Sequence, residues 1–437
     1  MKRLIICVML IILAFAMFNA TAIAQEEVTL TIQWAAGAPM DTLMILAEDF
    51  TAQTGIKVVG DAVPWALYHD KMFTDLASGR PGFDIVLPDS QWLGAAVEGG
   101  HLVDLTDWVN ENVDKNLIFE EMLRAYSEYP DGSGRYYGIP GSANALGISY
   151  RKDLFEDPAE QAAFKEKYGY PLDVPQTWSQ LRDIAEFFYR PEQNLYGIAL
   201  WQRPTATAGV VDQFLSLFWA FGAELWNPET RRVKGYLNSE EGKAAARLWV
   251  ELFQFHPPGA AGYSVDDTNV AMRKGMVAMM GTYFSFYPGI HNPDLSLYWD
   301  RIGWFPTPGE KRRVSQLGGQ GMSISAYTPH KEEALKFLEW WLREETQWKW
   351  VRAGFFSPRV DIIEDDRFLE YAPPNEAVRA SFPVLKDFWE IPLYHEMGTV
   401  MAEILNKAVL GQLTPEEAMD LVAERHEEIL QREGYYN

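Results

Sequence analysis

The stretch FDIVLPDSQWLG, residues 83–94, joins a short buried strand to a group of polar side chains. Ile85, Val86 and Leu87 form a continuous apolar run of the kind that predicts a buried strand. The next residues, from Asp89 to Trp92, supply a carboxylate, a hydroxyl, an amide and an indole. In open α/β sheets, ligands bind in the crevice outside the strand ends. The stretch therefore predicts an α/β fold with a binding site at this strand end.

The residues before this stretch alternate between strand and helix patterns. From Val28 the sequence VTLTIQW alternates apolar and polar residues, which is the period of a half-buried strand. We expect Asp41 to cap the helix that follows, and TGIKVV, residues 54–59, to form a second strand. Strand, helix and strand in this order are typical of α/β proteins.

The C-terminal third is mostly helical in pattern. Thr328 is expected to cap a helix with Pro329 at its first position, and Thr414 and Glu417 predict a capping box. The chain contains no long flexible linker, which tandem domains usually have. Two α/β lobes that share several chain crossings therefore fit the sequence better than domains in tandem.

The N-terminus has the features of a secretory signal peptide. Lys2 and Arg3 precede an apolar run over residues 4–18, and the small residues of Ala22 to Ala24 follow. We expect cleavage after Ala24, with a second candidate site at residues 20–22. Since the only cysteine is Cys7, the mature chain would have no disulfide and no lipid anchor. These features predict a free protein of the bacterial periplasm.

Charge and composition exclude some partners. The formal net charge is −23, and such a field repels nucleic acids and anionic membrane surfaces. Aromatic residues make up 14% of the chain, with 16 Trp, which is more than core filling requires. We therefore expect some aromatic rings to face a ligand.

The sequence contains no recognisable catalytic or metal-binding motif. It lacks a G-x-S-x-G elbow, a phosphate-binding loop, an H-E-x-x-H pair and an EF-hand spacing. We expect a protein that is not an enzyme and that has no metal and no cofactor. A glycosidase needs only two carboxylates placed by the fold, so 61 acidic residues leave that alternative open.

Three longer stretches carry a family resemblance. They are residues 50–59 (FTAQTGIKVV) with 64–106, residues 136–155 (YYGIPGSANALGISYRKDLF) and residues 318–341 (GGQGMSISAYTPHKEEALKFLEWW). Together they resemble the family 1 extracellular solute-binding proteins, the maltose-binding-protein-like receptors of ABC sugar importers. The resemblance runs from about Val28 to about Gly434.

The resemblance implies a two-lobed periplasmic-binding-protein fold of type II with a multi-strand hinge and a ligand cleft between the lobes. The first lobe would comprise residues 25–143 plus 283–326, and the second residues 147–281 plus 329–437. The implied partners are a small carbohydrate and the permease subunits of an ABC importer in the inner membrane. We expect a monomer that closes around its ligand.

A sugar site needs aromatic planes for apolar ring faces and planar polar groups for hydroxyls. Asp89 and Gln91 are predicted to bind hydroxyls and Trp92 to stack, unless Asp89 or Ser90 only caps a helix. For every aromatic candidate, packing in the core is the structural alternative. The further candidates, from strand ends and from positions that the resemblance indicates, are Trp34, Trp65, Asn144, Trp201, Gln202, Arg203, Trp219, Glu224, Trp226, Tyr283, Phe284, Gly319, Gln320, Arg359, Trp389 and Tyr394.

The ligand class is predicted from the aromatic subsites that the sequence lacks and from its few basic candidates. The aromatic subsites of maltodextrin binders do not map onto this chain, so maltose is not predicted. Only Arg203 and Arg359 stand out as basic candidates, which favours a neutral oligosaccharide, glycoside or polyol over a uronate. The open alternatives are a secreted carbohydrate-active enzyme with Asp89 or Glu224 as acid/base, and the same fold with a polyamine, a peptide or an anion as ligand.

Overall fold

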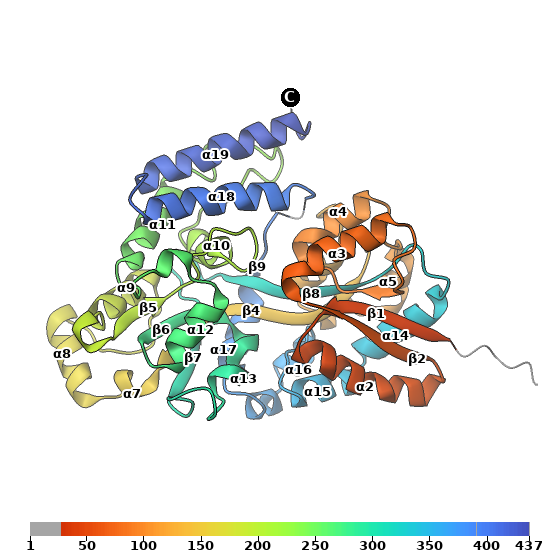
Figure 1. The fold of residues 1–437 in the computed structure, drawn as a ribbon, viewed down its shortest axis with the longest axis horizontal. Helices are drawn as coiled ribbons and strands as arrows, with labels where there is room; N and C mark the ends of the chain where they lie inside the picture. Colours follow the sequence, from red (N-terminus) through yellow and green to blue (C-terminus); the bar gives the residue numbers. More distant parts are fainter. Residues whose placement is uncertain (1–27, 390, 437) are drawn as a thin grey trace, which may run out of the picture.

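The computed structural model describes residues 28–389 and 391–436 (Figure 1). The expected signal peptide and Cys7 lie outside these residues. Within the described ranges, no helix combines the length and the apolar character of a bilayer span.

A mixed sheet runs through the whole molecule. Its strands follow the order β2-β1-β3-β8-β4-β6-β5, while β7 pairs with β4 and β9 with β8. The bounds are β1 Thr29–Ala35, β2 Lys57–Val63, β3 Ile85–Val86, β4 Ile139–Arg151, β5 Tyr196–Ala199, β6 Val277–Tyr283, β7 Ile302–Pro306, β8 Ser315–Ile324 and β9 Leu385–Lys386.

The first strands confirm the strand, helix and strand pattern. β1 pairs in parallel with β2 and with β3, and Ile32 lies opposite Ile85. Helix α2, Ala38–Thr54, connects β1 to β2 but has Gly37 as its N-cap. The expectation for Asp41 is wrong, because Pro39 near the helix start places this residue within the first turn.

Strand β4 crosses from one half of the sheet to the other (Figure 1). Its first half pairs with β8, from Ile139 opposite Met322 to Ala145 opposite Leu317. Its second half, from Leu146 onward, pairs with β6 and β7. One strand of 13 residues therefore contributes to both halves of the molecule.

The buried apolar residues form two large cores and smaller ones. Helices with residues in the first core are α2, α3 (Trp65–Ala77), α4 (Leu93–Glu98), α5 (Thr106–Asn112), α6 (Glu120–Ser127), α14 (Lys331–Leu342) and α15 (Glu344–Arg352). Those with residues in the second are α7 (Lys152–Phe155), α8 (Pro158–Tyr168), α9 (Trp178–Phe187), α10 (Val210–Ala220), α11 (Glu240–Phe253), α18 (Tyr394–Val409) and α19 (Pro415–Arg432). The smaller cores involve α6 (Glu120–Ser127), α12 (Val265–Arg273), α13 (Tyr287–Ile290), α16 (Val360–Ile363) and α17 (Asn375–Ser381).

The C-terminal helices match the expectations only in part. Thr414 forms the predicted capping box with Glu417 at the start of α19. Thr328 does not cap a helix, because α14 begins at Lys331, and the Thr328 hydroxyl instead accepts a bond from the His330 amide at 2.9 Å. Phe337 and Trp341 of α14 lie in the first core. The lobe boundaries stay a prediction, but this packing differs from the expected assignment of residues from 329 onward to the second lobe.

Candidate functional site

Three polar groups meet at the ends of strands of the first core. Asp89 follows β3, and its carboxylate accepts a hydrogen bond of 3.0 Å from the Ser90 amide, so it does cap the short 3-10 helix Ser90–Trp92. Its backbone also forms a bridge to Gln320 of β8. Trp34, at the end of β1, donates from its indole Nε1 to Gln320 Oε1 over 3.4 Å. The fold thus brings Trp34, Asp89 and Gln320 together.

The second core contributes an acidic and an aromatic residue to the same place. Asp212 lies in the first turn of α10 and accepts a bond of 3.0 Å from the Gly209 amide. The hydroxyl of Tyr283, at the end of β6, lies 3.2 Å from Asp212 Oδ1 and also bonds to Gln316 Oε1. The Trp201 ring meets the Tyr283 ring edge to face at 5.3 Å.

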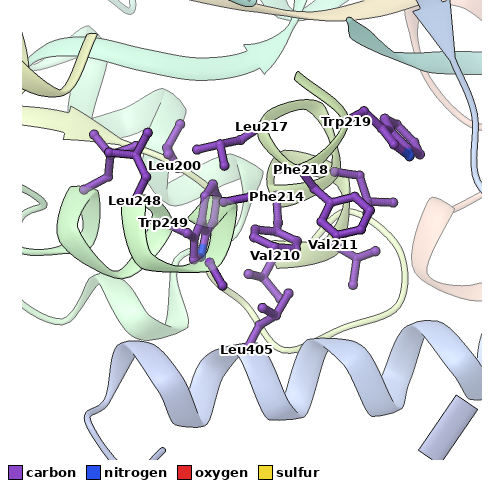
Figure 2. Packing of buried hydrophobic residues seen from close by; sticks show 14 of the residues in the cluster. Leu200, Val210, Val211, Phe214, Leu217, Phe218, Trp219, Leu248, Trp249 and Leu405 are labelled. Atoms are coloured by element: carbon purple, nitrogen blue, oxygen red, sulfur yellow. The ribbon is translucent and has the colours of Figure 1, made fainter. Parts of the chain in front are cut away.

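Helix α10 holds Asp212 rigidly because the rest of the helix is buried. Figure 2 shows Val210, Val211, Phe214, Leu217 and Phe218 of α10 beside Leu248 and Trp249 of α11 and Leu405 of α18. All of these α10 residues are fully shielded from solvent. The apolar helix therefore fixes the position of its single carboxylate.

A third carboxylate, Asp387, follows strand β9. β9 pairs with β8, so that Gln316 lies opposite Lys386, the residue before Asp387. The Asp387 side chain is 4% exposed and lies beside the Ser90 hydroxyl. Burial raises the pKa of Asp387 to about 6.

The three carboxylates influence one another. Burial raises the pKa of Asp89 well above its ordinary value, and repulsion from Asp387 and then Asp212 adds to that rise. Burial also raises the pKa of Asp212 to about 7, with a contribution from Asp387. Such mutual effects occur only between groups that share one place in the fold. Among the described residues, the structure has no group of three or more side chains arranged to hold a metal ion.

Trp92 packs against aromatic side chains of α3. Trp92 is 4% exposed, and the outer ring of Trp65, which is 37% exposed, stacks on it at 5.5 Å. Tyr68 and His69 meet Trp92 edge to face. Gln91 is buried, and its Oε1 lacks a partner among the described residues. The structure thus places Trp92 within packed rings, with Trp65 and the 36% exposed side chain of His69 at the outside.

The candidates near the strand crossings contact neighbouring parts of the sheet. Asn144 donates from its amide to Ser285 Oγ at 2.7 Å, and Phe284 is fully buried below β4. Gly319 has a φ of +111°, and a Cβ there would lie 1.9 Å from the Ser142 carbonyl oxygen. Gly319 thus permits the close approach of β4 and β8 at the crossing.

The remaining candidates lie in or against the second core, or at ion pairs. Lys386 lies over the buried Trp219 ring at 5.6 Å, and Glu224 is bound by Lys386 and, at 2.6 Å, by Arg312. Arg359 pairs with Asp361 at 2.7 Å and donates to the Leu342 carbonyl. Arg203 is exposed, Gln202 and Trp389 are buried, Trp226 packs partly against the second core, and the Tyr394 hydroxyl donates to the Ala206 carbonyl.

Sequence reasoning missed Asp212, Asp387 and Gln316. A signal existed for Asp212, because a carboxylate inside the apolar run VVDQFLSLFW is unusual unless it has a role. Nothing in the local sequence distinguishes Asp387 from the other acidic residues.

Comparisons with known proteins agree with this architecture. Residues 35–348 match the sequence profile of the family described as bacterial extracellular solute-binding protein. The chain is 24% identical over 403 residues to a Sinorhizobium fredii protein named a probable amino-acid ABC transporter periplasmic-binding protein, covering 91% of this chain and 88% of that protein. It is 22% identical to the mannitol-binding protein of Pseudomonas aeruginosa, covering 97% of this chain and 98% of that protein.

Solved structures share the fold. The solute-binding protein of Agrobacterium radiobacter in complex with ribitol has a TM-score of 0.76 and 25% identity, and the match covers 92% of this chain and 98% of that one. Maltose-bound MalE3 of Thermotoga maritima has the same TM-score at 22% identity, over 92% of this chain and all of that one. The match to the family covers well over half of the sequence, and the chain therefore belongs to the bacterial extracellular solute-binding proteins.

Proposed function

We propose that the protein is a receptor that binds a small polyhydroxylated molecule, a polyol or a sugar, and delivers it to the permease of an ABC importer. The observation that carries this proposal is that two groups, Trp34, Asp89 and Gln320 in one half of the sheet and Asp212 and Tyr283 in the other, lie close enough for the charges of Asp89 and Asp212 to affect each other's surroundings. Carboxylates and amides suit paired hydroxyl groups, while indole rings suit the apolar faces of a carbon chain or ring.

Relatives support the ligand class. They include the mannitol-binding protein, an erythritol/L-threitol-binding protein of Mycolicibacterium smegmatis and the ribitol-bound structure. Because burial disfavours charge at the three acidic side chains, the site is poorly suited to a further carboxylate, such as that of a uronate or an amino acid. A neutral polyol or sugar is therefore favoured over an anionic ligand.

The family supports a role outside the cytoplasm. The protein acts outside the cytoplasmic membrane, with residues 1–24 as a cleaved signal peptide and a monomer as the working form. The lobes divide at the strand crossings of β4, β6 and β8, and α14 belongs with the first lobe because it packs on that core. Closure of the two lobes on the ligand creates the form that the permease recognises.

Isothermal titration calorimetry of the chain without residues 1–24 tests the proposal. The panel comprises D-mannitol, ribitol, D-glucitol, D-glucose, maltose and D-galacturonate. We expect a heat that saturates near one ligand per protein for a polyol or neutral sugar. Absence of saturable heat from every polyol and sugar would overturn the receptor role for this ligand class. A heat that continues at a constant rate after each injection would instead indicate turnover by an enzyme.

A further inference from the structure

The Tyr283 hydroxyl lies between two oxygen atoms that can each accept its hydrogen. It is 3.2 Å from Asp212 Oδ1 and 2.5 Å from Gln316 Oε1. A tyrosine hydroxyl has one hydrogen to donate. The amide nitrogen of Gln316 donates to the Leu317 carbonyl oxygen, so Oε1, which can only accept, faces Tyr283. The shorter contact therefore takes the hydrogen of Tyr283, and the contact with Asp212 needs a second hydrogen.

Asp212 can supply that hydrogen only as a neutral carboxyl group. Its Oδ2 accepts from the Gly209 amide at 3.0 Å, which leaves Oδ1 to face Tyr283. A protonated carboxyl group donates from one oxygen and accepts at the other, and both of these contacts are then satisfied. An ionised carboxylate would instead compete with Gln316 for the single hydrogen of Tyr283. The hydrogen-bond count thus indicates that the structure contains Asp212 in its protonated form.

Acidic groups around Asp212 favour the same form. Burial raises the pKa of Asp212 to about 7, and the charge of Asp387, which follows β9, adds to that rise. The charge of Asp212 in turn contributes to the raised pKa values of Asp89, Tyr283 and Tyr394 of α18. All of these neighbours become negative when they ionise, so each of them disfavours a charge on Asp212.

The elements packed on α10 add apolar neighbours. Leu248 and Trp249 of α11 and Leu405 of α18 lie against the helix (Figure 2). On β9, the Lys386 ammonium bonds to Glu224. Apolar surroundings disfavour an ionised carboxylate, as the nearby acids do.

The bonded groups join α10 to two strands at the crossing. Tyr283 is the last residue of β6 and lies opposite Leu146 of β4. Gln316 is the second residue of β8, and its backbone amide donates at 3.0 Å to the hydroxyl of Ser216, one turn after Asp212 on α10. A proton on Asp212 therefore completes a chain of hydrogen bonds from α10 through β6 to β8.

We infer that Asp212 is a proton switch: the protonated carboxyl group donates to Tyr283, Tyr283 donates to Gln316, and α10 is fixed to β6 and β8. When Asp212 loses its proton to the solvent, its carboxylate takes the hydrogen of Tyr283, and Gln316 Oε1 loses this donor. In the proposed receptor the lobes divide at these strands, so the protonated form favours closure and tighter binding. This effect on binding rests on the proposed function, whereas the hydrogen bonds of the unliganded chain do not.

Urea unfolding of the unliganded protein tests the switch with Asp212→Asn. The Asn side chain keeps an N–H donor for Tyr283 and an oxygen for the Gly209 amide at every pH. The folded wild type holds the Asp212 proton more tightly than the unfolded chain, so this contribution to stability is lost as the pH rises from about 4 to about 7. We expect similar urea midpoints for the two proteins at pH 4 and a higher midpoint for Asp212→Asn at pH 8.

Asp107→Asn is the matched control, because Asp107 is an exposed residue of α5 and its replacement makes the same change in net charge. We expect this control to follow the wild type at both pH values. A midpoint difference between Asp212→Asn and wild type that is equal at pH 4 and at pH 8 would overturn the switch.

Calorimetry with the best ligand of the panel tests the effect on binding. We expect the Kd of the wild type to rise about threefold or more from pH 6 to pH 8, because closure takes up the Asp212 proton. Asp212→Asn cannot lose a proton there, so its Kd should change less over the same range. Tyr283→Phe is the second variant if Asp212→Asn does not fold by circular dichroism, since it removes the hydroxyl that connects Asp212 to Gln316.

The outcomes separate the two proposals. An equal pH dependence of Kd in the wild type and in the variants would overturn the switch and leave the receptor role intact. If no sugar or polyol of the panel binds, the proposed function is overturned, and the unfolding experiment alone decides whether Asp212 acts as a proton switch.

Discussion

The imidazole ring of His69 stacks on that of His395, with the ring centroids 5.6 Å apart and the planes inclined by 15°. His69 lies on α3, whose residues Tyr68 and Met72 belong to the first core. His395 lies on α18, whose Tyr394 and Met397 belong to the second core. The pair is thus a direct contact between two parts of the molecule that otherwise pack separately.

Replacing His69 by Gln should weaken ligand binding. A stacked aromatic pair contributes about 0.5–1.5 kcal/mol, and this pair forms only when α3 and α18 are together. We expect a two- to tenfold higher Kd by calorimetry with the best ligand of the panel. His101→Gln is the control, because His101 contacts Tyr327 and is remote in sequence from α18. Equal Kd values for wild type and His69→Gln would show that the stack makes no contribution to closure.

Trp92→Ala should lower stability strongly, whereas Trp65→Ala should lower it weakly. Trp92 is 4% exposed within its group of rings, but Trp65 is 37% exposed at the outside. Replacing a buried Trp by Ala lowers the free energy of unfolding by about 3–5 kcal/mol, and replacing a half-exposed Trp lowers it much less. Urea unfolding of the unliganded protein measures both values. A free energy of unfolding that changes by less than about 1 kcal/mol in Trp92→Ala would contradict its role in packing and favour the ligand-stacking role.

The unliganded protein should gain stability from Asp387→Asn in a pH-dependent way. Burial raises the pKa of Asp387 from 3.8 to about 6, so the folded state holds this proton more tightly than the unfolded state. The contribution of this group to the free energy of unfolding therefore falls as the pH rises from about 4 to about 6. The variant should be about 1–3 kcal/mol more stable than wild type at pH 8 and about equal at pH 4.

The difference between wild type and Asp387→Asn is the quantity to measure, since other groups act in the opposite direction. Burial lowers the pKa of His256 and of His426 to about 4, so both favour unfolding as the pH falls below 6.5. Both histidines are present in the two proteins, and their effect cancels in the difference. A difference that is constant between pH 4 and pH 8 would contradict the raised pKa of Asp387.

Gly319→Ala should lower the free energy of unfolding far more than Gly132→Ala. Both glycines have a positive φ, which strains any other residue by about 1–3 kcal/mol. At Gly319 a Cβ would also lie 1.9 Å from the Ser142 carbonyl oxygen, whereas nothing lies within 4 Å at Gly132. We expect a stability loss of about 1 kcal/mol for Gly132→Ala and of at least about 3 kcal/mol for Gly319→Ala, measured by urea unfolding. Similar losses in the two variants would show that the strand crossing tolerates a side chain.

Local sequence patterns predicted the fold class correctly. They predicted the first residue of some helices incorrectly. The alternation from Val28 predicted β1, and the run Ile85 to Leu87 predicted β3, which comprises Ile85 and Val86, because these patterns reflect which face of a segment is buried. The capping box of Thr414 is correct, since it involves residues only three apart. The capping roles of Asp41 and Thr328 are wrong, because prolines nearby shift where each helix begins.

The sequence by itself determined the class of fold and the polar end of strand β3, because both depend on residues that are neighbours in the chain. Only the tertiary structure decided that Asp212 and Asp387 lie with Asp89, that Trp92 lies within a group of rings and that α14 packs on the first core. The first of these arrangements depends on β8, which pairs with β9 and, across more than 170 residues of sequence, with β4. The position of a side chain after such a crossing depends on the register of distant strands, and no local pattern encodes that register.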